Sequence, residues 1–219
     1  MFCRIWKKID GRIFILLVLL IPIFCSCGSA SDEISSRSVS KNFLDGPIQT
    51  PVKNQKPYHV KIDEMEWTLV PVYRYRLRGI LVSSKSYGGL FSDWRGDLAP
   101  MDLAVVWGGL AKDRLYRRLS WSQANRWYYW SYGSDFPYDN RWIVKRSSNT
   151  HIIPANDEVL KRIKKIKPHQ PVDLEGFLVK VQGRKGSKKY WWNSSTSRSD
   201  EGNGSCELMY VTAVKKITP

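Results

Sequence analysis

Residues 73–78 read Tyr73-Arg74-Tyr75-Arg76-Leu77-Arg78 and are the clearest part of an extended stretch from Trp67 to Ser83. Aromatic or aliphatic side chains alternate strictly with arginines here, and a period of two places successive side chains on opposite faces of a β-strand. The pattern therefore predicts a half-buried strand. Pro71 predicts an edge or a bulge near its start, and Gly79 predicts a bend or a close backbone approach.

The three arginines of this strand, Arg74, Arg76 and Arg78, share one face and allow two interpretations. They form either a solvated row on the outer side of a sheet, which is the common outcome for such strands, or one wall of an anion-binding site. Both interpretations leave the aromatic and aliphatic face of the strand in the core.

Six further segments have strand character, with apolar alternation or with many β-branched and aromatic residues. They are residues 58–63, 117–121, 126–132, 172–182, 189–193 and 206–217. The second and third of them predict a hairpin around Ser122–Asn125. Residues 101–110 have apolar side chains at helical spacing and predict a short helix, with a buried strand as the alternative.

Residues 156–167 carry the clearest helical signal. Asn156 is the predicted N-cap, acidic residues follow in the first turn, and lysines in the last turn complement the helix dipole before Pro168. One face is apolar. The opposite face is either an ordinary solvated surface or a contact for anionic lipid. This basic face consists of Lys161, Arg162, Lys164 and Lys165.

Several strands with one or two helices predict an α+β fold that is mainly β. The helix 156–167 leads directly into the strand 172–182. This order favours a small, partly open β-barrel similar to the oligonucleotide- and oligosaccharide-binding (OB) fold. Gly176 within that strand would allow it to coil tightly.

The chain begins with basic residues, an apolar run over residues 13–24 and then Cys25-Ser26-Cys27-Gly28. The apolar run is shorter than the roughly 20 residues of a spanning helix. Residues 1–27 therefore predict a signal peptide or lipoprotein leader. Cys27 follows a small residue and is the predicted lipid-attachment site, while a retained signal anchor and plain secretion are the alternatives.

The rest of the chain divides into two parts. Residues 28–57 show neither a helical nor a strand period and predict a flexible tether. Residues 58–219 predict one basic, β-rich globular domain. We expect this domain to be exported and held at the membrane on the periplasmic side, as a lipoprotein or through a signal anchor.

The charge of the chain is strongly positive, with 35 Lys and Arg against 20 Asp and Glu. Without the leader, 31 basic and 19 acidic residues remain, a net charge of +12. Such a surface favours anionic lipid, lipopolysaccharide or other acidic envelope polymers, or it serves solubility alone. Export removes cytoplasmic nucleic acid from the expected partners.

Four large aromatic residues occur in a row, Trp127-Tyr128-Tyr129-Trp130. Alternation along a strand sends two of them to each face. One pair enters the core. The other pair is either packed under the following loop or exposed as a platform on which sugars, lipids or single-stranded nucleic acid stack.

Several segments resemble an uncharacterised, lipoprotein-like family of exported or membrane-anchored bacterial proteins, with the match running from Trp67 to the C-terminus. They are APMDLAVVWG (99–108), RWYYW (126–130), SSNTHIIPA (147–155), and SRSD leading to GSCEL (197–200 and 204–208). The resemblance implies a location and no known activity. Related sequences often carry histidine at the position of Arg146, so its absence here weakens a two-histidine site.

No strong catalytic or cofactor signature is present, and His59, His151 and His169 are isolated, so neither a metal nor a cofactor is expected. A candidate polar cluster contains Asn149, His151, Arg198 and Asp200. A catalytic interpretation pairs Cys206 or Ser148 with a His151 imidazole that Asn149 or Asp200 orients. The alternative is a turn in which these side chains bind local backbone groups. Cys206, in a strand-like segment, is expected to be an inert core cysteine.

Three functions follow as competing hypotheses. The leading one is a non-enzymatic, lipid-anchored envelope domain that binds an anionic envelope component or an envelope partner protein. The second is a hydrolase or transferase centred on His151. The third is a nucleic-acid-binding module that uses the arginine strand and exposed aromatic residues.

Overall fold

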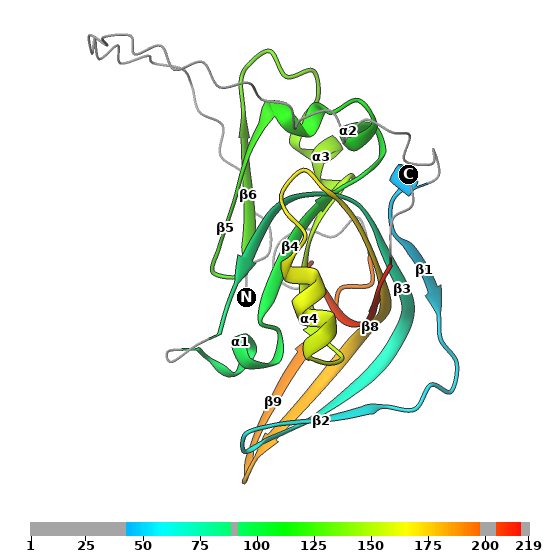
Figure 1. The fold of residues 1–219 in the computed structure, drawn as a ribbon, viewed down its shortest axis with the longest axis vertical. Coiled ribbons are helices and arrows are strands. Elements are labelled where there is room, and N and C mark those ends of the chain that lie inside the picture. Colours follow the sequence, from blue (N-terminus) through cyan, green and yellow to red (C-terminus); the bar gives the residue numbers. More distant parts are fainter. Residues whose placement is uncertain (1–42, 89–91, 198–204, 216–219) are drawn as a thin grey trace, which may run out of the picture.

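A single strand of 22 residues, β3 (Met65–Ser86), organises the fold (Figure 1). The computed structural model describes residues 43–88, 92–197 and 205–215. The strands are β1 (Ile48–Pro51), β2 (Tyr58–Ile62), β3, β4 (Met101–Val106), β5 (Leu119–Ala124), β6 (Trp127–Tyr132), β7 (Ser147–Pro154), β8 (Pro171–Lys185), β9 (Lys188–Asn193) and β10 (Glu207–Val214). The helices are α1 (Trp94–Leu98), α2 (Gly108–Lys112), α3 (Asn140–Val144) and α4 (Asp157–Lys164), with 3-10 turns η1 (Phe43–Asp45) and η2 (Leu115–Arg118).

The two edges of β3 pair with different strands. One edge pairs with β8 from Glu66 to Ile80, and the other pairs in succession with β2, β1 and β4. The register shifts between Pro71 and Tyr73, which confirms the predicted bulge. Gly79 confirms the predicted close approach, because a Cβ at this position would lie 2.3 Å from the carbonyl oxygen of Val106.

Five strands of the larger sheet form a closed ring. The order is β3-β4-β7-β10-β8, and β8 pairs back onto β3. Neighbours in the ring are antiparallel except β7 and β10, which are parallel. The fold is therefore α+β and mainly β, as the sequence predicts.

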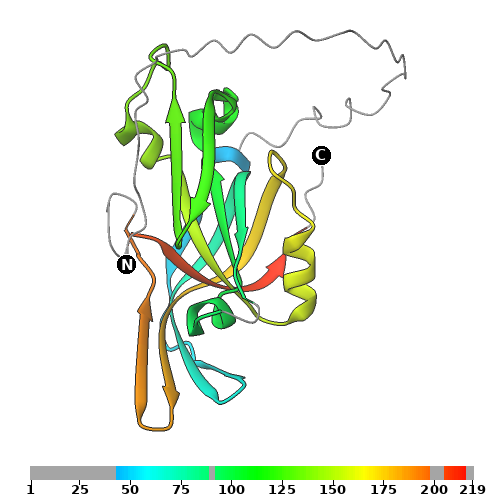
Figure 2. The ribbon, with the colours of Figure 1, turned by 90° about the vertical axis from the view of Figure 1, so that its left-hand side faces the viewer.

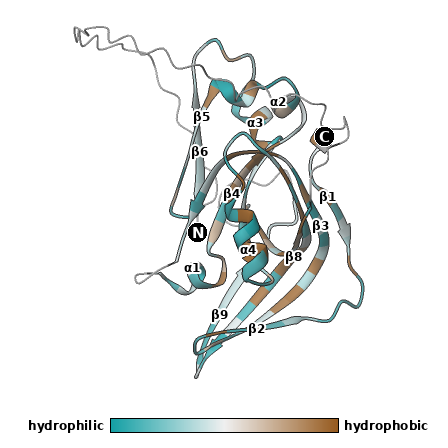
Figure 3. Cartoon of the chain, viewed as in Figure 1, coloured by the Kyte–Doolittle hydropathy of each residue, from teal (hydrophilic) through white to brown (hydrophobic). Residues whose placement is uncertain are grey.

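The side chains that point into the ring form the main hydrophobic core. Alternate residues of its strands supply fully buried side chains such as Leu77, Leu103, Leu174 and Met209. Brown and teal segments accordingly alternate along β3 and β8 in Figure 3. α4 packs onto this core through its apolar face, and the side chain of its N-cap Asn156 accepts a hydrogen bond from the backbone N–H of Val159, at 3.0 Å. The structure therefore confirms the predicted N-cap.

The β5–β6 hairpin is a separate two-stranded sheet that covers the outside of the ring near β3 and β4 (Figure 2). Tyr128 and Trp130 of the hairpin pack against Ala104 and Val106 of β4. The hairpin was predicted, but with its turn around Ser122–Asn125. The turn instead consists of Asn125 and Arg126, which both have positive φ (51° and 69°), as a two-residue hairpin turn requires.

Three expectations about the elements were wrong. Residues 101–106 are strand β4 and not a helix, because β4 is buried on both faces and shows no alternation. The predicted tether 28–57 contains η1 and β1, and β1 is held by backbone pairing to β3 although Ile48 is half-exposed. The described residues also contain four α-helices instead of one or two, since three of them have only five residues and too little length for a periodic signal.

In the described ranges 43–88, 92–197 and 205–215, no helix has the length and apolar character needed to cross a membrane. The predicted leader, residues 1–27, and its predicted lipid-attachment residue Cys27 lie outside these ranges.

Candidate functional site

Parts of four strands continue beyond the ring as a sheet in the order β2-β3-β8-β9, at the lower end of the molecule in Figures 1 and 2. We call this region the distal sheet. It comprises β2, residues 65–70 of β3, residues 179–185 of β8, and β9. Its two long inner strands belong to the ring as well, so the ring supports it rigidly.

The register of the distal sheet defines its outer face, because directly paired residues of antiparallel strands lie on the same side. One row runs across Thr68, Gln182 and Trp191, and the next across Glu66, Arg184 and Lys189. The Trp191 side chain is 61% exposed. These two rows line an open groove of about 470 Å³.

The outer face of the distal sheet is basic. Four cationic residues lie on it, Lys61, Lys180, Arg184 and Lys189, against the single carboxylate of Glu66, which pairs with Arg184 at 3.2 Å. We call these four residues together with Trp191 the Trp191 face. An exposed indole among cations can stack on or contact a ligand while the cations pair with its phosphate or carboxylate groups.

A second polar arrangement is buried on the outside of β4 and β7. Asp102 of β4 and His151 of β7 are direct neighbours in the register, and His151 Nδ1 lies 2.8 Å from Asp102 Oδ1. Arg126, in the turn of the β5–β6 hairpin, donates from Nη1 to the same oxygen at 2.8 Å and to the carbonyl oxygen of Ala99 at 2.8 Å. All three charged or polar side chains are buried.

The surroundings of this cluster close it against solvent. The guanidinium of Arg126 lies 3.7 Å from the ring centroid of Tyr87, and the ring of Trp192 lies 4.9 Å from that of His151. Asn149 donates from Nδ2 to the carbonyl oxygen of Arg126 at 3.0 Å. The cluster therefore attaches the tip of the hairpin to the ring, since Arg126 contacts four residues outside the hairpin, namely Ala99, Asp102, Tyr87 and Asn149.

Because of Tyr87, the stability that this cluster provides depends on pH. Burial, and secondly the negative charge of Asp102, raise the pKa of Tyr87 to about 12. A tyrosine in the unfolded chain ionises near pH 10. The contribution of Tyr87 to stability is therefore fully present below about pH 10 and is lost as the pH rises through about 12.

We expect the difference in unfolding free energy between the wild type and Tyr87→Phe to shrink as the pH rises from about 9 to 12. Denaturant unfolding at a series of pH values measures this difference. The variant also loses the hydrogen bond that the Arg126 N–H donates to the Tyr87 hydroxyl, at 3.0 Å, which lowers stability at every pH. A pH-independent difference would show that the environment of Tyr87 does not oppose its ionisation.

The predicted arginine row does lie on the outside of β3, but its members have different environments. Arg76 forms a bidentate pair with Asp173, at 2.8 and 2.7 Å, and this pairing raises its pKa. Arg74 lies over the ring of Phe177, 5.7 Å from the centroid. Arg78 is half-buried. The row is therefore not a continuous wall of free cations.

The predicted basic face of the helix is exposed on α4. Lys161, Lys164 and Lys165 are exposed, and Arg162 donates a hydrogen bond to the carbonyl oxygen of Val214. This patch lies on a different element from the Trp191 face, so the two are separate candidates for an anionic ligand.

The predicted aromatic platform is not exposed. Trp127, Tyr128 and Trp130 are buried and Tyr129 is half-buried. Tyr128 and Trp130 pack against the ring of strands as part of the core, whereas Trp127 and Tyr129 form a separate cluster with Cys206. The sequence could not decide this point, because the same alternation is expected of packed and of exposed aromatic residues.

The predicted polar cluster is only partly assembled. Asn149 and His151 share the outer side of β7, a strand and not a turn, whereas Ser148, which precedes them, lies on the opposite side and contacts Thr150 at 3.1 Å. Cys206 is buried beside Trp127, as expected of an inert core cysteine, and it is disulfide-bonded, which leaves no thiol for the nucleophile role. Arg198 and Asp200 lie outside the described residues.

Sequence reasoning missed Asp102, Arg126 and Trp191. Asp102 is the only charged residue in the otherwise apolar β4, and a lone charge in a buried strand signals a buried partner. Trp191 alternates with the buried Trp192, but the sequence alone does not say which of the two faces solvent.

Comparisons with protein-family models, with curated proteins and with solved structures find no match to this chain. Within the described residues, no group of three or more His, Cys, Asp or Glu side chains is arranged to hold a metal ion.

Proposed function

We propose that this chain is an exported, membrane-anchored envelope domain that binds an anionic envelope component through the Trp191 face. The observation that carries this proposal is the 61% exposure of Trp191 beside the cations Arg184 and Lys189. An exposed indole of this size, on a rigid strand, is the residue that ligand binding would bury. The predicted leader and the net charge of the chain support the same location and ligand class.

The strand order supports a finer proposal, that the ring is a barrel of the OB kind. The first three strands of the ring along the chain, β3, β4 and β7, are neighbours in space. The fourth strand, β8, returns to lie beside the first, β3, and this is the Greek-key arrangement. β10 then closes the ring, and α4 connects its third and fourth strands. OB folds are five-stranded Greek-key barrels that use the connection between strands four and five in binding. Here that connection contains β9 and hence Trp191.

The test uses the full chain in micelles of a neutral detergent, with lipopolysaccharide as the soluble anionic probe and fluorescence anisotropy as the readout. Cations near an anionic surface contribute about 1 kcal/mol each. We therefore expect Arg184→Ala/Lys189→Ala to weaken binding about 10- to 30-fold at low salt, and we expect added salt to weaken wild-type binding.

The matched control is Lys164→Ala/Lys165→Ala on α4, which removes the same charge from the other basic surface. Its affinity should stay within about twofold of the wild type, because the α4 patch lies on a different element. An equal loss in both double variants would mean that net charge, not the Trp191 face, determines binding. If the chain did not bind lipopolysaccharide at low salt, the proposed anion binding would be refuted.

The OB-like strand order also favours nucleic acid as a second candidate ligand. Base stacking on an aromatic side chain contributes about 1–3 kcal/mol per base. A single-stranded oligonucleotide that binds more tightly than lipopolysaccharide, and that loses about tenfold or more in affinity on Trp191→Ala, would favour this candidate. The hydrolase hypothesis receives less support, because the His151–Asp102 pair is buried and Ser148 lies on the opposite side of β7.

A further inference from the structure

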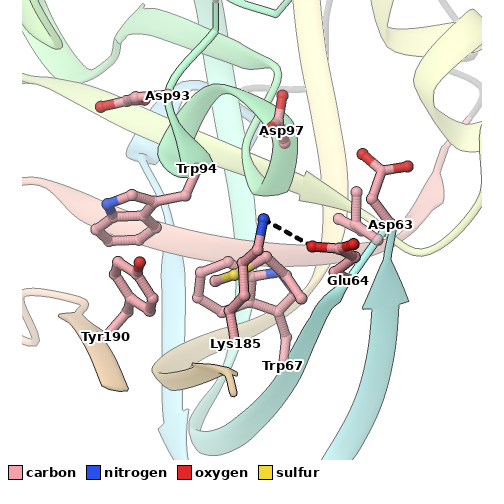
Figure 4. Close-up of a pocket in the computed structure, with 10 residues that line it drawn as sticks. Asp63, Glu64, Trp67, Asp93, Trp94, Asp97, Lys185 and Tyr190 are labelled. Carbon is pink, nitrogen blue, oxygen red and sulfur yellow. Dashed lines mark ion pairs between the residues drawn. The ribbon is translucent and has the colours of Figure 1, made fainter. Parts of the chain in front are cut away.

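The inner face of the distal sheet, opposite the Trp191 face, carries a second pocket (Figure 4). This pocket has a volume of about 350 Å³ and lies between the β2–β3 turn, α1 and the β8–β9 hairpin. The proposed anion-binding function does not use it. Its composition differs from that of the rest of this basic chain.

Three aromatic rings, Trp67, Trp94 and Tyr190, line the pocket together with the apolar side chains of Ile62 and Met65. The centroids of Trp67 and Trp94 lie 5.4 Å apart in a stacked arrangement, and Tyr190 lies 5.4 Å from Trp94. Trp67 is 1% exposed, and its indole Nε1 is buried without a hydrogen-bond partner. Because this atom is buried, a ligand reaches it only by displacing the side chains that cover it.

The charged part of the pocket is mainly acidic. Four carboxylates line it, from Asp63, Glu64, Asp93 and Asp97, against the single ammonium of Lys185. Lys185 pairs with Glu64 at 2.8 Å, which lowers the pKa of the Glu64 carboxyl and raises that of Lys185. Figure 4 shows the Lys185 side chain in front of the Trp67 ring.

Two of the carboxylates are engaged and two are available. Asp93 accepts hydrogen bonds from the backbone N–H groups of Arg95 and Gly96 at the start of α1, and it pairs with the Arg95 side chain. With Glu64 paired to Lys185, the carboxylates of Asp63 and Asp97 remain for a ligand. No set of three acidic side chains in the described residues is close enough to coordinate one metal ion, which argues for a larger, organic cation.

We propose that this pocket binds an organic cation, an ammonium or guanidinium group on a stem that also carries a hydrogen-bond acceptor. Aromatic faces attract such cations through their quadrupole, and carboxylates pair with them through charge-assisted hydrogen bonds. The acceptor on the stem satisfies the Trp67 N–H. The ligand competes with Lys185, which is the cation of this chain that now lies in the pocket.

The experiment measures binding of Nα-acetyl-L-arginine amide, hereafter arginine amide, to the full chain in neutral detergent micelles by isothermal titration calorimetry. Nα-acetyl-L-citrulline amide, hereafter citrulline amide, is the matched probe, because it replaces the guanidinium, the single cation of the first probe, by a neutral group of the same shape. We expect arginine amide to bind saturably and citrulline amide to bind at least about tenfold more weakly.

Variants of the chain separate a specific pocket from a diffuse acidic patch. Asp63→Asn/Asp97→Asn should weaken arginine amide about tenfold, whereas Lys185→Met should strengthen it several-fold by removing the competing cation. Asp157→Asn/Glu158→Gln on α4 removes the same charge from a distant surface and should change nothing. Equal binding of the two amides, or weaker binding by Lys185→Met, would overturn the proposal.

The outcome of the arginine amide experiment does not depend on the proposed anion binding. The two probes have opposite charge and the two sets of variants lie on opposite faces of the distal sheet. Failure of lipopolysaccharide binding therefore leaves the cation pocket testable, and failure of arginine amide binding leaves the Trp191 face testable.

Discussion

Replacing Arg126 by methionine is expected to lower the free energy of unfolding by about 3–5 kcal/mol. The substitution keeps much of the side-chain volume but leaves Asp102, which is fully buried, without its cation. A buried charge whose partner is removed keeps its desolvation cost and loses the compensating attraction. Equilibrium denaturation followed by tryptophan fluorescence measures the change.

The control for this prediction is Arg141→Met, which removes an arginine from the exposed surface of α3. Its unfolding free energy should stay within about 0.5 kcal/mol of the wild type. The double variant Arg126→Met/Asp102→Leu should recover part of the loss, because it removes both charges from the interior. A loss for Arg126→Met no larger than that for Arg141→Met would show that the buried pair does not hold the hairpin to the ring.

The buried cluster of Asp102, Arg126 and His151 has a structural role, which is to attach the β5–β6 hairpin to the ring. The β5–β6 hairpin lies in the connection between β4 and β7 and forms its own two-stranded sheet, without a backbone ladder to the ring. Its attachment depends on side chains: the aromatic residues at one end and the Arg126 contacts at the tip. We therefore expect weakening of the cluster to loosen the hairpin before the ring opens.

The parts of the fold that the sequence predicts are those with a local signal. The alternation of residues 73–78 identifies β3, Asn156 identifies the start of α4, and Pro71 identifies a bulge. β4 had no such signal, because a strand buried on both faces reads as a continuous apolar run that also fits a helix. β1 was missed because its backbone pairing, which no side-chain pattern reveals, holds it in place.

The candidate sites depend on long-range pairing and could not be predicted to the same extent. Asp102 and Arg126 are 24 residues apart, and their contact requires both the turn at Asn125 and the packing of the hairpin on β4. Likewise, the groove at Trp191 requires β8 to pair with β3 and β9 together. The sequence did indicate the basic charge and the aromatic content that these surfaces use.

Gly176→Ala is expected to have the second large effect, a loss of about 3 kcal/mol or more in unfolding free energy. A Cβ at Gly176 would lie 1.9 Å from the carbonyl oxygen of Tyr210 and 2.9 Å from its carbonyl carbon. These atoms belong to the backbone of β10, so a side-chain rotation cannot relieve the clash. β8 and β10 would have to separate where Gly176 pairs with Val211, next to the bulge in β10.

Because the β8–β10 pairing closes the ring of strands, this local separation has a specific consequence. The amides of β10 should exchange with solvent faster in Gly176→Ala, while those of the β5–β6 hairpin should change little, since the hairpin does not pair with β8 or β10. Gly109→Ala in α2 is the matched control and should stay within about 1 kcal/mol of the wild type, because its Cβ meets only side chains. Gly176→Ala could instead be as stable as Gly109→Ala, with its β10 amides still protected. This outcome would mean that β8 and β10 do not approach each other as closely as the closed ring requires, and the OB-like interpretation would lose its basis.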